Sequence, residues 1–255
     1  MVAPGAQRVA MQHLTGSEAG LDHVMVALDV PNAAAALALV ERLPQVRWWK
    51  VGLELFMAEG SRLLPLLKTQ QKGIFLDVKL HDIPNTVAGA VRAAVRYEVD
   101  FLSVHASGGI PMLQQAQEAT VGSSCRLLAI TLLTSISPAA LATQLHISES
   151  PTQYVQHLAA MAQSVGIPGV VCSPQEAAAL RTQVGADLCL VTPGIRLGTD
   201  ASGDQARVWT PAAARQAGVN FIVVGRPITQ AADPALALAT YVRHWSDLPN
   251  PTNAQ

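Results

Sequence analysis

Residues Phe75–Thr86 read FLDVKLHDIPNT, a stretch that begins like a buried strand and then becomes charged. Asp77, Lys79 and Asp82 follow one another closely behind the apolar start. A charge buried in a protein is costly unless it is paired. Side chains alternate along a strand, so Asp77 and Lys79 are expected on one face. The stretch therefore predicts either a structural ion pair or a functional site at the end of a strand.

Short apolar runs of the same kind recur along the chain, with Ala/Leu-rich helical stretches between them. The runs predict strands at 23–30, 46–52, 73–80, 101–106, 126–133, 169–173, 188–195 and 221–226. The stretches between and after them predict helices at 33–43, 61–69, 87–98, 112–119, 154–165, 174–184, 211–218 and 234–245. Continuous apolar strands are typical of a parallel sheet buried on both faces. The alternation predicts an α/β fold, a single-domain (β/α)8 TIM barrel. A doubly wound sheet is the alternative, but no GxGxxG follows the first strand.

Length and composition fit one barrel. The chain has 255 residues, of which 50% are hydrophobic, and a net charge of −1. The sequence predicts a barrel over 22–247, a flexible N-terminal extension over 1–21 and a C-terminal tail over 248–255. We expect neither a secretory signal nor a membrane span, since no apolar run is long enough. The absence of a basic run argues against nucleic acid as a partner.

The three cysteines are odd in number, lie in or beside apolar runs, and show no metal-ligand spacing: Cys125, Cys172 and Cys189. We expect them to be reduced core thiols in a cytoplasmic protein that holds no metal.

Polar residues gather where the predicted strands end, which is the end that carries the active site in barrels of this type. The first three strands end with Asp29, with Lys50, and with Asp77 and Lys79. Alternating charges of this kind keep the lysines protonated and the carboxylates ionised. The group therefore suits a lysine that acts as a general acid toward a developing carbanion.

A phosphate site is predicted at the end of the eighth strand. Gly225 and Arg226 precede a helix there, and barrels of this type commonly bind phosphate after strands seven and eight. The polar segment 196–208 after the seventh strand is interpreted as a lid. His105, after the fourth strand, is interpreted as structural. These features predict a phosphorylated small molecule as the ligand.

FLDVKLHDIPNT also resembles the signature of the orotidine 5′-phosphate decarboxylase family, Asp-x-Lys-x-x-Asp followed by Ile-Pro-Asn-Thr. The similarity continues through VALDV, KVGLELF, VHASGG, TLLTS, GVVCS, LVTPGIR, GDQ and VVGRPIT, and it is greatest for the bacterial branch. It implies decarboxylation of orotidine 5′-phosphate to uridine 5′-phosphate, the last step of de novo pyrimidine nucleotide synthesis. It also implies a homodimer with sites shared across the interface, and no metal or other cofactor.

The resemblance also assigns roles to individual residues. Lys79 is implied as the proton donor to C6 of the pyrimidine, and Asp77 as the group facing the substrate's carboxylate. Catalytic roles are implied for Lys79, Asp77, Asp82 and Lys50. Substrate contacts are implied for Asp29, Lys50, Asp82, Thr86, Thr134, Arg196, Gln205, Gly225 and Arg226, with Asp82 and Thr86 reaching into the neighbouring subunit's site.

Two alternatives stay open from the sequence. Hexulose-phosphate synthases and keto-gulonate-phosphate decarboxylases share Asp-x-Lys-x-x-Asp but need Mg²⁺, and they resemble this chain less at Lys50, where they carry an acidic metal ligand. The second alternative is a nucleotide-binding barrel without activity, against which the intact set of Asp77, Lys79 and Asp82 argues.

Overall fold

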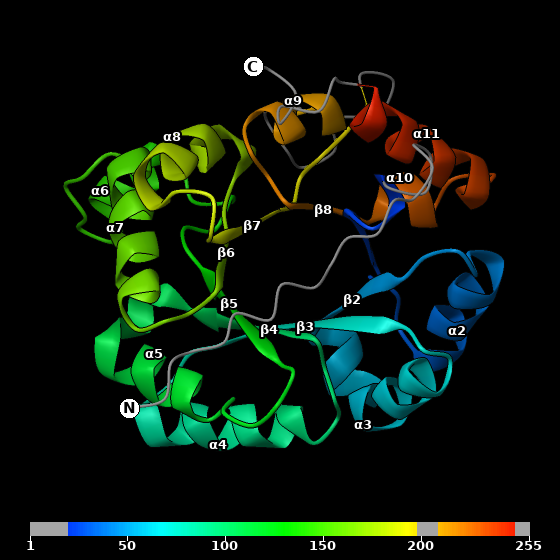
Figure 1. Cartoon of the computed structure of the whole chain (residues 1–255), viewed down its shortest axis with the longest axis horizontal. Coiled ribbons are helices and arrows are strands. Elements are labelled where there is room, and N and C mark those ends of the chain that lie inside the picture. Colours follow the sequence, from blue (N-terminus) through cyan, green and yellow to red (C-terminus); the bar gives the residue numbers. More distant parts are fainter. Residues whose placement is uncertain (1–19, 198–208, 248–255) are drawn as a thin grey trace.

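The computed structural model describes residues 20–197 and 209–247, and these form a closed parallel barrel surrounded by helices (Figure 1). Strands pair in chain order, and the last pairs with the first to close the ring. The prediction of a (β/α)8 barrel is confirmed. Predictions about 1–19 and 248–255 fall outside the described residues.

The bounds of the elements follow the predicted alternation closely. The strands are β1 (Val24–Ala27), β2 (Trp48–Gly52), β3 (Gly73–Leu80), β4 (Phe101–His105), β5 (Arg126–Ile130), β6 (Gly169–Val171), β7 (Cys189–Thr192) and β8 (Phe221–Val224). The helices are α2 (Ala33–Arg42), α3 (Leu53–Thr69), α4 (Pro84–Val95), α5 (Gly109–Glu118), α6 (Pro138–Thr143), α7 (Pro151–Ser164), α8 (Pro174–Val184), α9 (Pro211–Gln216), α10 (Arg226–Thr229) and α11 (Pro234–Ser246), with a 3-10 turn, η1 (Ala106–Gly108), after β4.

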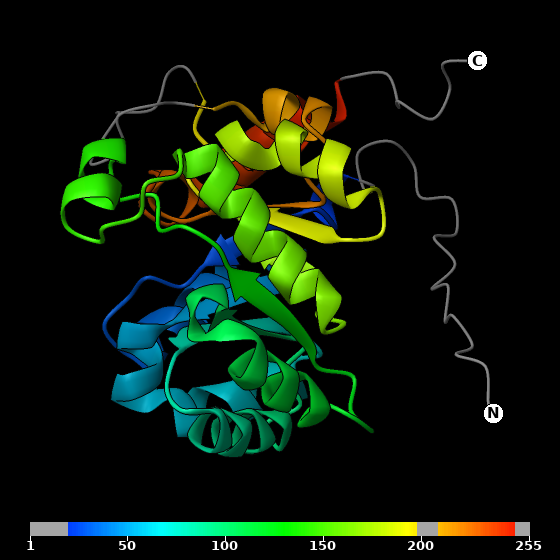
Figure 2. The same cartoon turned by 90° about the vertical axis from the view of Figure 1, so that its left-hand side faces the viewer.

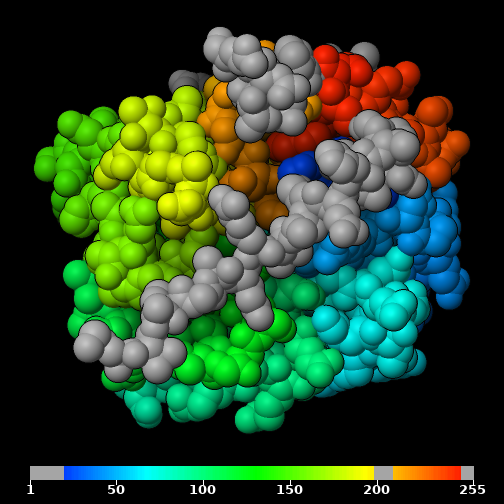
Figure 3. Space-filling view, in the orientation of Figure 1, coloured from blue at the N-terminus to red at the C-terminus, as the bar shows by residue number. Residues whose placement is uncertain are grey.

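Successive segments follow one another around the ring of helices. The colours run in order from blue α2 through green α5 to red α11 in Figure 1, and the space-filling view in Figure 3 repeats this order at the surface. Turning the molecule by 90° shows α7 and α8 packed outside the strands (Figure 2). Each helix therefore covers the outside of the barrel near its own strand, as right-handed crossovers require.

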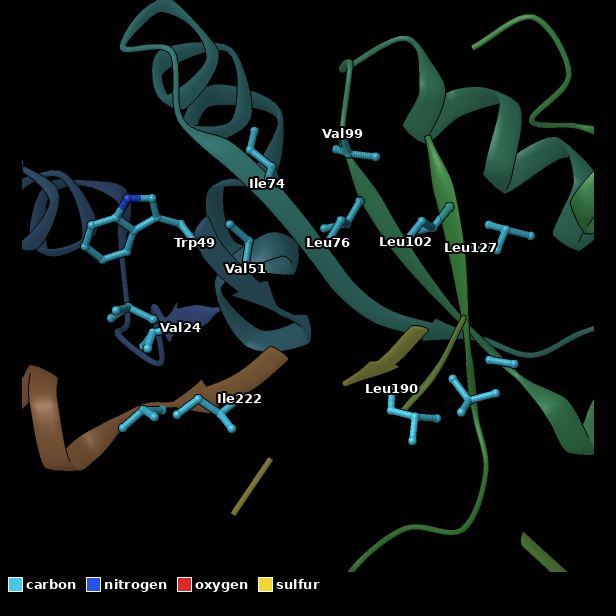
Figure 4. Packing of buried hydrophobic residues seen from close by; sticks show 14 of the residues in the cluster. Val24, Trp49, Val51, Ile74, Leu76, Val99, Leu102, Leu127, Leu190 and Ile222 are labelled. Atoms are coloured by element: carbon cyan, nitrogen blue, oxygen red, sulfur yellow. The ribbon is translucent and has the colours of Figure 1, made fainter. Parts of the chain in front are cut away.

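Apolar side chains pack on both faces of the strands. The outward-facing residues meet the helices, and Figure 4 shows Ile74 and Leu76 of β3 beside Leu102 of β4 in this outer core. A second, inner cluster fills the barrel itself with Met25, Ala27, Trp48, Phe75, Phe101, Leu128, Val191 and Val223. Within it the ring centroids of Trp48 and Phe101 lie 5.3 Å apart, edge to face. The inner cluster explains why the strands read as continuous apolar runs.

Local capping explains where several helices begin. Helix α7 starts with a capping box, in which Ser150 accepts from the backbone N–H of Gln153 and the Gln153 side chain accepts from the backbone of Ser150. Helix α8 starts with Ser173, which accepts from Gln175 N–H, and with Pro174 in the first turn. A hydroxyl cap followed by proline is a favoured helix start.

Several elements differ from the sequence prediction, among them the short α10 and η1, which were not predicted. Helix α3 begins at Leu53 rather than at residue 61, because the chain turns helical directly after β2 and kinks at Glu59 instead of ending there. The segment 135–151, which has no clear periodicity, contains the short helix α6, capped by Ser137. Within the described ranges, no helix is both long and apolar enough to cross a membrane.

Candidate active site

A cavity of about 310 Å³ opens where the strands of the barrel end. Its lining comes from many strands and from the loops behind them, namely Ala27, Asp29, Lys50, Phe75, Asp77, Lys79, Ile130, Leu132, Leu133, Thr134, Val171, Cys172, Pro193, Gly194, Arg196, Val223, Gly225 and Arg226. Phe75 also belongs to the inner apolar cluster below. The cavity thus has an apolar floor and a charged side, where Lys50, Asp77 and Lys79 converge.

The charged side is a connected network of two lysines and two aspartates. Lys79 Nζ lies 2.8 Å from each carboxylate oxygen of Asp77. Lys50 Nζ donates to Asp29 Oδ1 at 3.0 Å and lies 3.9 Å from Asp77 Oδ2. The Asp77 side chain is 12% exposed and that of Lys50 is 13%, whereas Asp29 is 52% exposed. The predicted clustering of Asp29, Lys50, Asp77 and Lys79 is therefore observed, with Asp77 at its centre.

The backbone of β3 is irregular at this point. Leu76 pairs with Leu102 and Leu80 pairs with Val104, so β3 contains extra residues that β4 does not match. Within this bulge Lys79 has a φ of +52°, which is unusual for a residue with a side chain. Asp77 and Lys79 meet as predicted, but simple alternation along a strand is not the reason. The bulge re-aims Lys79 toward Asp77, as bulges near active sites often do.

Ser103 of β4 is a member of this network that the sequence analysis missed. Its hydroxyl donates to Asp77 Oδ1 at 2.9 Å and accepts from the backbone N–H of Lys79 at 2.8 Å. Ser103 is fully buried. The available signal was its position: it alternates with Phe101, an inner-cluster residue, so it had to face the barrel interior.

His105 lies one step further along the inner face of β4 and packs against His81. The two ring centroids are 5.2 Å apart. Burial lowers the pKa of His105 from its usual value of 6.5, and the neighbouring His81 and Lys79 lower it further, while Asp77 opposes them. His105 does not line the cavity, and its packing against His81 agrees with the structural role predicted for it.

The residues predicted to contact the phosphate and the pyrimidine, namely Gly225, Arg226 and Thr134, also line the cavity. Gly225 and Arg226 follow β8, and Thr134 lies in the loop after β5. A Cβ atom at Gly225 would come within 3.1 Å of Asp29 Oδ2, so this glycine leaves room for the carboxylate.

Arg196 lines the cavity at the start of the predicted lid and is 7% exposed. Its backbone N–H donates to Trp209 O at 2.9 Å, so the two ends of the segment are held together. Gln205, predicted to bind phosphate, lies outside the described residues.

Asp82 and Thr86 do not line this cavity. Asp82 is exposed, and its Oδ1 accepts a hydrogen bond from Ile83 N–H at 2.6 Å. Thr86 lies in the first turn of α4 and is also exposed. The structure therefore brings together all the predicted site residues that it describes except these two, which were expected to serve a neighbouring subunit.

A second hollow, of about 370 Å³, lies away from the strand ends. Lys68, Val95, Glu98, Val99, Ser123, Ser124 and Cys125 line it. Lys68 and Glu98 are its charged lining residues, and it contains no cluster of charges like that around Asp77. Within 20–197 and 209–247, no group of three or more His, Cys, Asp or Glu residues could hold a metal ion.

Cys125 and Cys172 are buried as predicted, whereas Cys189 is only partly buried. Burial raises the pKa of Cys125 and Cys189 to about 11 and that of Cys172 to about 12, so the thiols stay protonated. Cys172 also lines the cavity, next to the end of β6. It therefore supplies an apolar wall there rather than a nucleophile.

Comparison with protein families identifies the barrel. Residues 22–241 match the model of the orotidine 5′-phosphate decarboxylase / HUMPS family. The chain belongs to this family. The match spans all the strands of the described barrel and includes Asp77, Lys79 and Asp82.

Several members of this family that resemble the chain are named orotidine 5′-phosphate decarboxylase. The chain is 52% identical over 214 residues to an orotidine 5′-phosphate decarboxylase of Thermosynechococcus vestitus, covering 84% of this chain and 92% of that protein. It is 50% identical over 223 residues to one of Nostoc, covering 85% and 94%. The crystal structure of orotidine 5′-phosphate decarboxylase from Lactobacillus acidophilus superimposes with a TM-score of 0.78 at 37% identity, covering 87% of this chain and 98% of that one.

Proposed function

We propose that this protein decarboxylates orotidine 5′-phosphate to uridine 5′-phosphate. The observation that carries the proposal is the network of Lys50, Asp77 and Lys79 in the cavity, in a chain about half identical to decarboxylases of that name. The proposal includes a cytoplasmic location, where free thiols stay reduced.

Lys79 is the proposed proton donor. The bond between C6 and the carboxylate breaks, its electron pair stays on C6, and CO2 leaves. A proton then passes from Lys79 Nζ to C6, and the neutral amine regains a proton from solvent. A fixed ammonium beside the developing carbanion lowers the barrier because it need not reorganise during the reaction. The bonds from Lys79 Nζ to both Asp77 oxygens support this role, since they hold the ammonium at the cavity wall.

Asp77 is proposed to face the carboxylate that leaves. Two carboxylates held close together repel each other, and loss of CO2 relieves that repulsion. Metal independence is part of the proposal. Lys50 and Lys79 already place two ammonium groups beside Asp77, and these would repel a divalent cation.

Substrate binding is assigned to the rest of the cavity wall. Arg226 and Gly225, with Gln205, are proposed to hold the phosphate, and Thr134 the pyrimidine. Arg196 begins the segment proposed to close over the ligand. Asp29 and Lys50 are proposed to bind the ribose, and their mutual bond of 3.0 Å leaves other lone pairs and protons for hydroxyls. Phosphate binding far from C6 then contributes to lowering the barrier.

A homodimer with shared sites is the second part of the proposal. Asp82 and Thr86 are exposed and away from this chain's own cavity. Near them in the chain, Ile83 is 68% exposed, and Leu53 and Met57 on the first turns of α3 are 56% and 74% exposed. Leu53 and Ile83 follow the ends of the paired strands β2 and β3, and apolar side chains that are exposed together are typical of an interface. We propose that this surface meets a second copy and delivers Asp82 and Thr86 to its cavity.

The activity is tested by following the ultraviolet absorbance of orotidine 5′-phosphate with purified protein, with and without EDTA. We expect equal turnover in both. No turnover would refute the proposal. Turnover that EDTA abolishes would instead support a Mg²⁺-dependent member of the same family.

Shared sites are tested by mixing two inactive variants, Asp82→Asn and Lys79→Ala. A mixed dimer combines an intact Lys79 from one subunit with an intact Asp82 from the other, so we expect activity to return in one of its two sites. Absence of recovery, with mixed dimers shown by mass spectrometry, would place Asp82 in its own subunit's site.

A further inference from the structure

Ser103 occupies an unusual place on the inner face of the barrel. It lies in β4 between Phe101, which packs in the inner apolar cluster, and His105 at the end of the strand. It is 0% exposed. A buried hydroxyl needs partners, because desolvation without a hydrogen bond is costly. The identity of those partners indicates what Ser103 does.

The first partner is the backbone of Lys79. The bulge in β3 shifts the pairing with β4 between Leu76 and Leu80, and so leaves the residues between them out of the regular ladder. The N–H of Lys79 instead donates to Ser103 Oγ at 2.8 Å. The hydroxyl thus replaces a main-chain acceptor at the residue with a φ of +52°. It stabilises a backbone conformation that a lysine rarely adopts.

The second partner is the carboxylate of Asp77. Ser103 Oγ donates its only proton to Asp77 Oδ1 at 2.9 Å. Asp77 Oδ1 also accepts a hydrogen bond from Lys79 Nζ at 2.8 Å. One hydroxyl therefore fixes the main chain that carries Lys79 and the carboxylate that holds its ammonium. Asp77 also lies 3.9 Å from Lys50 Nζ, so its orientation affects both lysines.

We infer that Ser103 is a positioning residue for the reaction: its hydroxyl locks the β3 bulge and thereby sets where the Lys79 ammonium lies. This inference rests on the function proposed above. Electrostatic catalysis depends on charges that are already in place, so a looser Lys79 lowers kcat. The proposed phosphate contacts lie on other residues, and Lys50 keeps its own hydrogen bond to Asp29 in the variant, so KM changes little.

The test compares hydroxyl deletions at two buried positions, Ser103 in β4 and Thr131 directly after β5. Ser103→Ala removes both hydrogen bonds, whereas Ser103→Thr keeps the hydroxyl. The matched control is Thr131→Val, which deletes a hydroxyl that is 4% exposed and donates to Val171 O at 2.9 Å, with no bond to Asp77 or Lys79. Circular dichroism and thermal unfolding identify the folded variants. Should Ser103→Ala not fold, Ser103→Cys keeps the shape with a weak donor and takes its place.

We expect Ser103→Ala to lower kcat by about 10- to 100-fold with KM changed less than about threefold. Ser103→Thr should recover most of the loss, and Thr131→Val should stay near the parent value. Three results would overturn the inference: an unchanged kcat in Ser103→Ala, a raised KM with kcat intact, or an equal loss of kcat in Thr131→Val.

A second readout does not depend on turnover. The chain has four lysines, Lys50, Lys68, Lys72 and Lys79, so their labelled ε-carbons give few NMR signals. Ser103→Ala should shift the signal of Lys79, assigned with Lys79→Arg, and leave those of Lys68 and Lys72 in place. An unmoved Lys79 signal would contradict the positioning role. If the parent protein does not decarboxylate orotidine 5′-phosphate, the proposed function fails, and this NMR comparison still decides the role of Ser103.

Discussion

Two lysine–aspartate pairs lie near opposite ends of β3, and they differ in their surroundings. At the end of the strand Lys79 contacts both oxygens of Asp77 at 2.8 Å. Near its start Lys68 Nζ lies 3.3 Å from Asp100 Oδ2, which also accepts from Ile74 N–H at 2.8 Å. Both pairs are partly buried. The contact between opposite charges therefore does not distinguish them.

The difference lies in what else surrounds each carboxylate. Asp77 is shared between Lys79, Lys50 and Ser103 and faces the cavity in the barrel mouth. Asp100 ties the end of α3 to the backbone of β3. The first arrangement gathers charge that a ligand can use, while the second satisfies groups of the fold itself. We therefore expect changes in the mouth to affect activity and changes near the strand start to affect stability.

The largest expected effect is on turnover in Lys79→Ala. Loss of the ammonium removes both the proton donor and the charge beside C6, so kcat/KM should fall by at least about 10³-fold. Binding of uridine 5′-phosphate, measured by calorimetry, should persist. The matched control, Lys68→Ala, should decarboxylate like the parent. Equal losses in the two variants would remove the distinction between the pairs.

A smaller effect is expected from Arg226→Ala, which changes a lining residue of the cavity after β8. Loss of a charged contact to the phosphate should raise KM by about 10- to 100-fold, since hydrogen bonds to charged groups contribute about 1.5–3 kcal/mol. Steady-state kinetics on orotidine 5′-phosphate and on orotidine without its phosphate measure this. In Arg226→Ala the KM values for the two substrates should lie closer together than in the parent. An undiminished preference for the phosphorylated one would place the phosphate elsewhere.

Asp100→Ala tests the other side of the comparison. It removes the acceptor of Ile74 N–H and the partner of Lys68, so the free energy of unfolding should fall by about 1–3 kcal/mol. Urea unfolding gives this value, and kcat per folded molecule should not change. A loss of kcat without a loss of stability would show that the strand start also contributes to catalysis.

The smallest expected effect is the pH dependence of stability due to His105. Its pKa is lowered in the folded protein, first by burial and then by His81 and Lys79, with Asp77 opposing. The unfolded chain therefore binds a proton more readily, and stability falls as pH drops from above the usual value of 6.5 through the lowered pKa. In urea unfolding at about pH 7.5 and pH 5.5, His105→Gln should lose less stability than the parent. The exposed His146→Asn is the control and should follow the parent; the same slope in all three proteins would exclude His105 as a cause.

Much of the fold follows from sequence pattern. Apolar strands such as 126–130 and helices that start at Ser-Pro pairs such as Ser173–Pro174 carry local signals that predict them. The start of helix α3 was harder to predict, because Gly60 looks like a helix break in the sequence. In the structure the helix only kinks there, at Glu59. The helix continues there because Leu55, Leu63 and Leu67 are buried against the barrel.

Part of the candidate site could also be predicted from local sequence pattern. Asp29, Lys50 and Asp77 could be placed because each follows or ends an apolar strand, and strand ends meet at one rim. The bulge at Lys79 could not be predicted, since no glycine marks its positive φ. Ser103 of β4 reaches Lys79 and Asp77 because the bulge shifts the pairing of β3 with β4. Its hydrogen bonds to these residues therefore depend on how the two strands pair, which the sequence does not show.

Hydrogen exchange at C6 of the product tests the central claim most directly. A group that delivers a proton to C6 must also remove that proton in the reverse direction. On the product this exchange takes place without decarboxylation, so it reports on the proton transfer alone. We would follow 5-fluorouridine 5′-phosphate in D2O by NMR, since the fluorine stabilises a carbanion at C6. The parent protein and Lys68→Ala should exchange the C6 hydrogen for deuterium at the same rate, and Lys79→Ala should not exchange it above the rate in buffer. Exchange by Lys79→Ala at the parent rate would contradict the assignment of Lys79 as the proton donor.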